Sequence, residues 1–281
     1  MISCVVSPTQ ESSGVGRTVT DDLGRTVAIP KKVNRAISLA PSITESIFAA
    51  GAGDRLVGVT TYCNYPAETS AIEKVGDTQT PNIERIIALK PDIVFVSTAS
   101  QLEAFTQTLA EQNIAVFVSN AVSLDGAIAG IRKFGEIFET NAKANATAGD
   151  IERRANALND RLKDQMKVRV FVQISKEPLF TIGKTSFLTE TVEHAGAVSV
   201  TKDIESAYPK LSKETALALN PDAIIISDSE DNREANDVFK NSPAVKNGRV
   251  YKIDTDIISR PGPRLVDAIE QIAGFLHGEK N

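Results

Sequence analysis

Two carboxylates, Glu84 and Glu214, hold the same position in two copies of one pattern. Residues 81–97 are PNIERIIALKPDIVFVS, and residues 211–227 are LSKETALALNPDAIIIS. Each copy predicts a short helix, a Pro-Asp turn and a buried strand, with the glutamate seven residues before the proline of the turn. The helix dipole favours such a charge by about 0.3–1 kcal/mol, which would explain either glutamate alone. Because both copies carry it, we also expect two exposed carboxylates that dock onto basic sockets of a two-fold symmetric partner.

Side chains that could carry catalysis are few. The two histidines, His194 and His277, stand near the ends of predicted helices, where the helix dipole favours a surface histidine. Two histidines cannot make a three-histidine zinc or manganese site, and the sequence has no HExxH, nucleophile-elbow or GxGxxG pattern. Residues 182–186, IGKTS, resemble a phosphate-binding loop, but Pro178 stands where its first glycine is required. We therefore expect a protein that is not an enzyme and uses no catalytic cofactor or metal.

A ligand-binding role is predicted for the loop at residues 60–68, TTYCNYPAE. Tyr62 and Tyr65 flank Cys63 and Asn64 in a chain with four tyrosines and no tryptophan. The loop follows a predicted strand, and open α/β sheets bind ligands beyond the carboxyl ends of their strands. The tyrosines could stack on a flat ligand, or one of them could pack under the loop. Cys63 could ligate a soft metal, although a small packing residue is the simpler interpretation.

Two further stretches carry candidate binding residues. Tyr208 stands just before the second copy of the repeat, and its counterpart before the first copy is DTQTP, residues 77–81. Arg260 lies in a stiff Pro-rich loop after the last predicted strand, together with Asp256. An arginine there can meet a carboxylate, amide or phosphate of a ligand, or it can hold the loop through a salt bridge. The same two interpretations apply to Asp256.

The elements that would position these residues alternate between strands and helices. Residues 18–30 predict a hairpin with Val19 and Val27 on either side of an Asp-Asp-Leu-Gly turn. Ser42 and Glu45 fit a capping box at the start of a helix that ends at Gly51. Further strands are predicted at 35–39, 56–59, 93–96, 115–118, 168–174, 180–182 and 250–253, and further helices at 83–89, 102–111, 187–195 and up to His277. This alternation predicts βαβ units with parallel sheets.

Residues 123–166 interrupt the alternation with almost no proline or strand signal. One apolar helical stripe runs through Ile151, Ala155, Leu158, Leu162 and Met166. A helix of about 25 residues would extend nearly 40 Å and could bridge two lobes. We therefore predict a flexible N-terminal tether at 1–19, an α/β lobe at 20–122, a helical crossing at 123–167 and a second α/β lobe at 168–281.

Composition and the N-terminal residues bear on location. With a net charge of −5 and a pI near 5.3, the chain is not expected to bind nucleic acid, and it has no apolar run of the ~18–20 residues that a membrane span needs. Cys4 is followed by a Ser/Thr/Gly-rich stretch to Thr20, as at the start of lipid-anchored bacterial proteins. We therefore expect a lipid anchor at Cys4, the alternative being an incidental cysteine.

The longest motifs resemble those of a known family. RAISLAPSITESIFAAGAGDRLVGVTTYCNYPAE, KVGDTQTPNIERIIALKPDIVFV, SAYPKLSKETALALNPDAIII and DTDIISRPGPRLVDAIEQIA are similar to stretches of periplasmic cobalamin-binding proteins of ABC importers. That family also includes siderophore and haem binders, and the resemblance covers nearly everything from Asp21 to Leu276. It implies two Rossmann-like lobes with parallel sheets joined by one long helix, the class III periplasmic-binding-protein fold. It also implies that Glu84 and Glu214 pair with arginines of a permease dimer.

The resemblance also points to ligand contacts. A tyrosine of the family's first cleft loop corresponds to Tyr62, and an aromatic position before the second repeat corresponds to Tyr208. Some cobalamin binders place tryptophans around the cleft, where this chain has Thr78, Tyr208 and Ile257. The predicted ligand-binding residues are Ser42, Tyr62, Asn64, Thr78, Gln79, Phe180, Tyr208, Asp256 and Arg260.

We therefore expect a monomeric, extracytoplasmic solute-binding protein in the periplasm or at the cell surface. It would bind cobalamin or a related corrinoid in a cleft between the lobes, without a protein ligand to the cobalt, and deliver it to an ABC permease. Three alternatives stay open. A siderophore binder would need several basic residues, and only Arg260 can be placed. A haem binder would need an axial ligand such as Tyr62 or Tyr208. An α/β enzyme would carry its active site in the same cleft.

Overall fold

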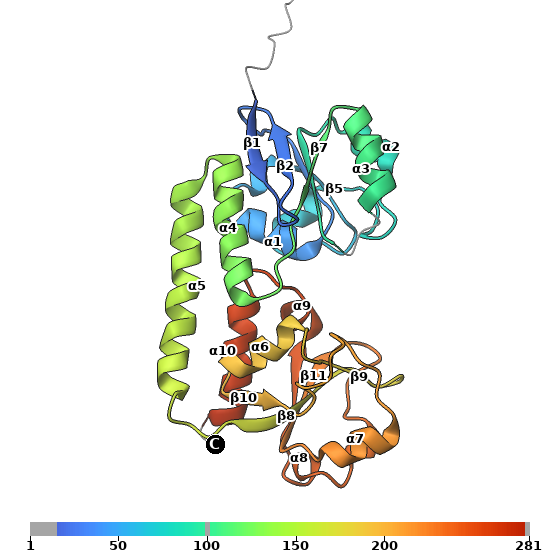
Figure 1. Cartoon of the computed structure of the whole chain (residues 1–281), viewed down its shortest axis with the longest axis vertical. Coiled ribbons are helices and arrows are strands. Elements are labelled where there is room, and N and C mark those ends of the chain that lie inside the picture. Colours follow the sequence, from blue (N-terminus) through green and yellow to red (C-terminus); the bar gives the residue numbers. More distant parts are fainter. Residues whose placement is uncertain (1–15, 99–101, 279–281) are drawn as a thin grey trace, which may run out of the picture. The chain divides into compact units, whose positions relative to one another are not determined.

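The computed structural model describes residues 16–98 and 102–278, which divide into two units with separate α/β cores (Figure 1). Unit 1 takes in the described chain up to Ala40, Asp54–Ser119 and Ile137–Glu139. Unit 2 takes in Pro41–Gly53, Asn120–Glu136 and the described chain from Thr140 onward. The predicted α/β class is confirmed, while the predicted lobe boundaries stay a prediction. Cys4 lies outside the described residues.

Unit 1 is built around a sheet of five parallel strands. In the order β5-β4-β3-β6-β7, they are β5 (Glu73–Lys74), β4 (Leu56–Val59), β3 (Ala36–Ser38), β6 (Ile93–Val96) and β7 (Ala115–Val118). All of β6 is buried, as expected of a central parallel strand that is covered on both faces. The helices α2 (Ile83–Ala88) and α3 (Leu102–Glu111) add Ile86 and Leu109 to the core. The strands predicted at 56–59, 93–96 and 115–118 are confirmed.

A hairpin precedes this sheet, formed by β1 (Arg17–Thr20) and β2 (Thr26–Ile29). Val19 lies opposite Val27, as the sequence predicted. The Asp21 carboxylate accepts hydrogen bonds from the amides of Leu23 and Arg25 at 3.0 and 2.9 Å, which closes the turn. It also accepts the Val118 amide at 3.3 Å and so ties the hairpin to β7.

Unit 2 contains the second sheet. Its parallel strands, in the order β10-β8-β11-β12, are β10 (Ala197–Ser199), β8 (Val168–Ser175), β11 (Ala223–Asp228) and β12 (Val250–Asp254), with β9 (Phe180–Thr181) antiparallel to β8. From β8 onward, the helices that alternate with these strands are α6 (Phe187–His194), α7 (Lys213–Leu219), α8 (Pro243–Lys246), α9 (Thr255–Ile258) and α10 (Leu265–His277). The sequence did not predict β5, β10, α8 or α9, because elements of two to four residues are too short to show a period.

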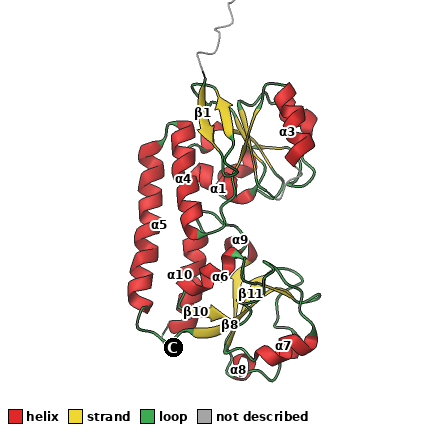
Figure 2. Cartoon of the chain, viewed as in Figure 1, coloured by secondary structure: helices red, strands yellow, loops and turns green. Residues whose placement is uncertain are grey.

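The residues predicted to form a helical crossing fold into two helices, α4 (Leu124–Phe138) and α5 (Asn141–Leu162), drawn in red in Figure 2. Arg132 of α4 and Glu152 of α5 form a bidentate ion pair at 2.8 Å, which holds the two helices together. The predicted stripe is buried at all its positions except Met166, which is 89% exposed. That assignment was wrong because α5 ends at Leu162. No helix within residues 16–98 and 102–278 is long and apolar enough to cross a membrane.

The helix α1 (Pro41–Ala49) belongs to unit 2, although its neighbours in the sequence belong to unit 1. The Thr147 hydroxyl of α5 donates to the Ala49 carbonyl at 3.0 Å and fixes the end of α1. The predicted capping box is wrong. The helix begins at Pro41, before Ser42, because proline suits the first helical position. Glu45 is not available to cap the helix, because its carboxylate is engaged by two arginines described below.

Candidate ligand-binding and docking sites

The two copies of the repeat fold into equivalent helices, α2 and α7. Asn82 caps α2 by accepting the Arg85 amide, and Ser212 caps α7 by accepting the Thr215 amide. Glu84 and Glu214 each occupy the second position of their helix, and both are exposed. The Glu214 carboxylate accepts hydrogen bonds from the backbone amide of Glu214 and from the Ser212 side chain. These bonds, the backbone one having the larger effect, hold the pKa of Glu214 below its usual value. Both glutamates are therefore accessible to a partner.

The ends of the two helices are also held in the same way. Arg35, just before β3, donates from Nη2 to the Leu89 carbonyl at 2.6 Å. Arg169, in β8, donates from Nη2 to the Leu219 carbonyl at 2.9 Å and from Nη1 to the Asn220 carbonyl at 3.1 Å. Because the last carbonyls of a helix have no partner within it, each arginine stabilises the helix that carries a candidate docking glutamate.

The predicted tyrosine loop of unit 1 is anchored by its cysteine. Cys63 is buried, and its thiol shares a hydrogen bond of 3.1 Å with the Thr60 hydroxyl. The Lys74 ammonium donates to the Cys63 carbonyl at 3.0 Å. On either side of this anchor, Tyr62 is 62% exposed and Tyr65 is 47% exposed. The packing interpretation of Cys63 is therefore confirmed, and Tyr62 presents its ring to solvent.

The turn with Thr78 and Gln79 lies beside this loop, because the Thr61 amide donates to the Gly76 carbonyl at 2.9 Å. The Asp77 carboxylate organises the turn by accepting the amides of Thr80 and Gln79 at 2.6 and 2.8 Å, and the Thr80 hydroxyl at 2.8 Å. These hydrogen bonds, the Thr80 amide first, lower the pKa of Asp77. Unit 1 therefore brings four predicted ligand residues onto neighbouring loops: Tyr62, Asn64, Thr78 and Gln79.

In unit 2, Phe180 and Tyr208 come from two segments that run side by side. The Thr181 amide donates to the Pro209 carbonyl at 3.1 Å, and the Gly183 amide donates to the Ala207 carbonyl at 2.9 Å. Gly183 allows this approach, because a Cβ atom there would lie 2.0 Å from the Ser206 carbonyl oxygen. This close contact explains why a glycine stands in the IGKTS motif, and no phosphate-binding role is needed to account for it.

Tyr208 is 44% exposed, and its hydroxyl is hydrogen-bonded to the side chain of Ser186. Burial raises the pKa of Tyr208, against the effect of that hydrogen bond, so the phenol stays protonated at neutral pH. The ring and its hydroxyl are therefore positioned from the start of α6, which Ser186 caps.

A network of ion pairs in unit 2 contains two more predicted residues. Arg260 donates to Glu45 Oε1 at 2.9 Å and pairs with Asp256 Oδ1 at 2.5 Å. Arg264 donates from Nε to Glu45 Oε2 at 2.8 Å and from Nη2 to Oε1 at 2.7 Å. The salt-bridge interpretation of Arg260 and Asp256 is therefore confirmed, and their ligand role stays a prediction.

Ser42 lies near this network, because a Cβ atom on Gly262 would meet the Ser42 carbonyl oxygen at 3.4 Å. Asp256 lies in α9, directly after β12, and Phe180, the first residue of β9, pairs with Ser175 at the end of β8. These residues are therefore at the carboxyl ends of the strands, where open α/β sheets bind ligands. Sequence reasoning missed Glu45 and Arg264 as members of this group, because no local pattern links positions 219 residues apart.

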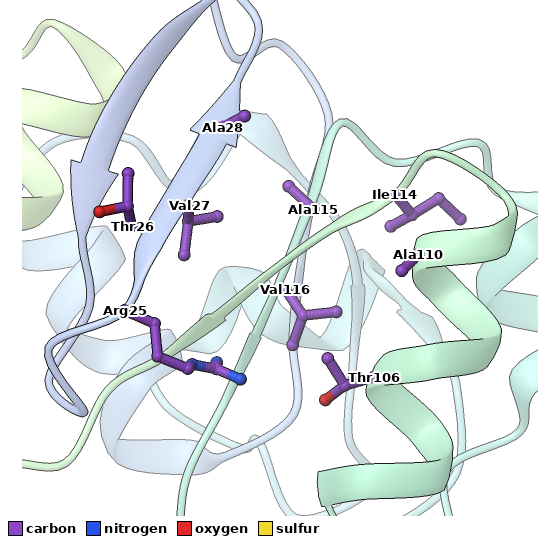
Figure 3. A pocket seen from close by; sticks show the side chains of 9 residues that line it. All are labelled: Arg25, Thr26, Val27, Ala28, Thr106, Ala110, Ile114, Ala115 and Val116. Carbon is purple, nitrogen blue, oxygen red and sulfur yellow. The ribbon is translucent and has the colours of Figure 1, made fainter.

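A separate groove of about 250 Å³ lies in unit 1, and Figure 3 shows the side chains that line it. They come from β2, β7 and α3 with flanking residues: Arg25, Thr26, Val27, Ala28, Thr106, Ala110, Ile114, Ala115 and Val116. None of them is a predicted ligand-binding residue. Within the described part of the chain, no group of three or more His, Cys, Asp or Glu residues is arranged to hold a metal ion.

The fold and these sites can be compared with known proteins. The family model described as "Periplasmic binding protein" matches residues 37–257. The chain belongs to this family. This periplasmic binding protein works in the periplasm or at the cell surface, and its α/β fold with parallel sheets is that of class III binding proteins.

Three similar proteins are informative. An ABC transporter substrate-binding lipoprotein of Bacillus subtilis, YvrC, itself uncharacterized, is 34% identical, over 92% of this chain and 85% of the relative. A vitamin B12-binding protein of Vibrio parahaemolyticus is 31% identical, over 88% of this chain and 91% of the relative. The crystal structure of the periplasmic vitamin B12-binding protein BtuF of Vibrio cholerae matches with a TM-score of 0.75 at 29% identity, and the match covers 87% of this chain and 96% of that one.

Proposed function

We propose that this periplasmic binding protein binds cobalamin or a related corrinoid and delivers it to an ABC permease. The observation that carries the proposal is the pair of exposed tyrosines on candidate ligand loops, Tyr62 in unit 1 and Tyr208 in unit 2. A corrinoid has a flat macrocycle on which tyrosine rings can stack, and peripheral amides that hydrogen-bond to polar side chains. The relatives named as vitamin B12-binding proteins support the same ligand class.

The remaining predicted contacts fit such a ligand. Asn64 and Gln79 offer amide groups on the unit 1 loops, and both are exposed. Ser42, Asp256 and Arg260 offer polar groups in unit 2, and Phe180 offers a second aromatic ring there. In this proposal, both of the predicted lobes, 20–122 and 168–281, supply ligand-binding residues. No protein side chain ligates the cobalt.

The protein's partner in this proposal is a permease dimer. Glu84 and Glu214 would each pair with basic residues of the permease, since equivalent helices present them in the same way. Binding involves no catalytic step and no catalytic cofactor, and the free protein is a monomer. Cys4 would carry a lipid anchor, as the lipoprotein relative suggests.

Calorimetry with purified protein against a panel of cyanocobalamin, cobinamide, haem and a ferric siderophore tests the ligand. The proposal predicts tight binding of the corrinoids alone. Haem binding with an absorption spectrum that changes in Tyr62→Phe or Tyr208→Phe would favour the haem alternative instead, because a phenolate ligand would have been lost. Turnover of a bound corrinoid would indicate the enzyme alternative.

A further inference from the structure

The ion-pair network in unit 2 runs from a deeply buried group to an accessible one. Glu45 is buried, with 1% of its side chain exposed. The Arg260 and Arg264 side chains are 10% and 15% exposed, and Asp256 is 33% exposed. A molecule that approaches from solvent therefore meets Asp256 and the edge of Arg260, while Glu45 lies behind both arginines.

A buried ion-pair network is weak evidence for stability, because the cost of moving charges out of water can exceed the attraction that the pairs return. What the four groups achieve together is charge balance. Two guanidinium groups face two carboxylates at 2.5–2.9 Å, so the network has no net formal charge. Without Glu45, the same set of groups would contain two guanidinium cations and one carboxylate, that of Asp256.

We propose that Glu45 is a positioning residue that sets the charge preference of the ligand site. It holds Arg260 against Asp256 and neutralises the arginine pair, so that the accessible edge favours a neutral amide over a carboxylate. An amide can donate to Asp256 and accept from Arg260 at once, whereas a carboxylate can only accept and is repelled by Asp256. The inference rests on the proposed corrinoid function, because corrinoids carry peripheral amides.

The experiment measures a ratio of affinities. Calorimetry gives the Kd for cyanocobalamin and for its monocarboxylic acid derivatives, in which one peripheral amide is hydrolysed. Wild-type protein should prefer the amide form. Glu45→Gln gives the network a charge of +1. The affinity for the derivative whose carboxylate meets Arg260 should then rise about fivefold relative to the affinity for cyanocobalamin.

A second variant predicts the opposite sign. Arg264→Gln gives the network a charge of −1. The affinity for cyanocobalamin, the amide form, should then rise relative to the affinity for the carboxylate derivative. Glu234→Gln is the matched control, since it removes a carboxylate that is 81% exposed and paired with Lys176 at 3.5 Å. It should leave the ratio unchanged. If Glu45→Gln does not fold, as judged by circular dichroism, the sign of the Arg264→Gln shift decides.

The outcomes separate this inference from the function on which it rests. Opposite shifts in the two variants support it. Equal loss of affinity for both ligands in each folded variant means that the network is merely structural and overturns it. Wild-type protein that binds neither ligand overturns the proposed function, and the charge preference with it.

Discussion

Arg35 and Arg169 make the same contact in the two units of this protein. Arg35 lies just before β3 and Arg169 lies in β8, outside the repeat in both units. Each arginine donates to the final carbonyls of the helix that carries a candidate docking glutamate. The residues that follow those carbonyls, Lys90 and Asn220, both adopt left-handed backbone conformations, with φ of 47° and 43°. The two copies of the repeat therefore match at the N-cap, at the C-terminal end and at the exposed glutamate of their helices.

Charge reversal at the two glutamates should separate docking from ligand binding. In Glu84→Lys/Glu214→Lys, uptake by cells that express the cognate permease should be lost, because like charges would face each other at both contacts. The Kd for the ligand should stay unchanged, since neither residue belongs to the candidate ligand loops. The control is Glu111→Lys/Glu230→Lys, which reverses two exposed glutamates elsewhere. Normal uptake by the first variant would exclude the docking role.

The tyrosines should contribute to affinity through their rings. Tyr62→Ala and Tyr208→Ala should each weaken corrinoid binding about tenfold, because each removes an aromatic surface that stacks on the ligand. Tyr208→Phe keeps the ring and loses the hydroxyl that bonds to Ser186, so its affinity should stay close to wild type. Calorimetry measures all three. Equal losses in Tyr208→Phe and Tyr208→Ala would show that the hydroxyl, and not the ring, is what matters.

Substitution of two glycines by alanine should change the stability of the protein in opposite directions. Gly183→Ala should lower the free energy of unfolding by about 2–3 kcal/mol, because the new methyl group would collide with the Ser206 carbonyl and displace the segment that carries Tyr208. A Cβ atom on Gly149, inside α5, would meet no described atom within 4 Å beyond its chain neighbours and the backbone of its own helix. Gly149→Ala should therefore raise the free energy of unfolding by about 0.5–1 kcal/mol. Denaturant titration measures both, and equal effects would contradict the described packing.

The Asp77 turn should show a defined pH dependence. Hydrogen bonds to the carboxylate lower its pKa in the folded protein, so its contribution to stability is present above the unfolded pKa of about 4. That contribution is lost as the pH falls through the lower folded pKa. The difference in unfolding free energy between wild type and Asp77→Asn should therefore be larger at pH 6 than at pH 3. A difference that grows toward pH 3 would mean that the assigned sign is wrong.

Much of the fold could be predicted because its signals are local. Buried parallel strands such as β6 appear as continuous apolar runs, and the hairpin register follows from Val19 and Val27 around one turn. The repeat showed Glu84 and Glu214 directly. Met166 was misplaced because periodicity continues past the residue where a helix stops.

The site was less predictable, because its contacts join distant segments. Glu45 looked like part of a capping box, since Ser42 stands three residues before it. In the structure it pairs with Arg260 and Arg264, 215 and 219 residues away. Local patterns do not encode such partners. They also did not show that α1 packs with unit 2 and carries Glu45 to this network.

Retention of cyanocobalamin after desalting tests the central claim most directly. Wild-type protein at micromolar concentration, incubated with cyanocobalamin and passed through a desalting column, should elute with about one corrinoid per chain by visible absorbance. The Tyr62→Ala/Tyr208→Ala variant should elute with markedly less. Folded wild-type protein that elutes without any corrinoid would contradict the account.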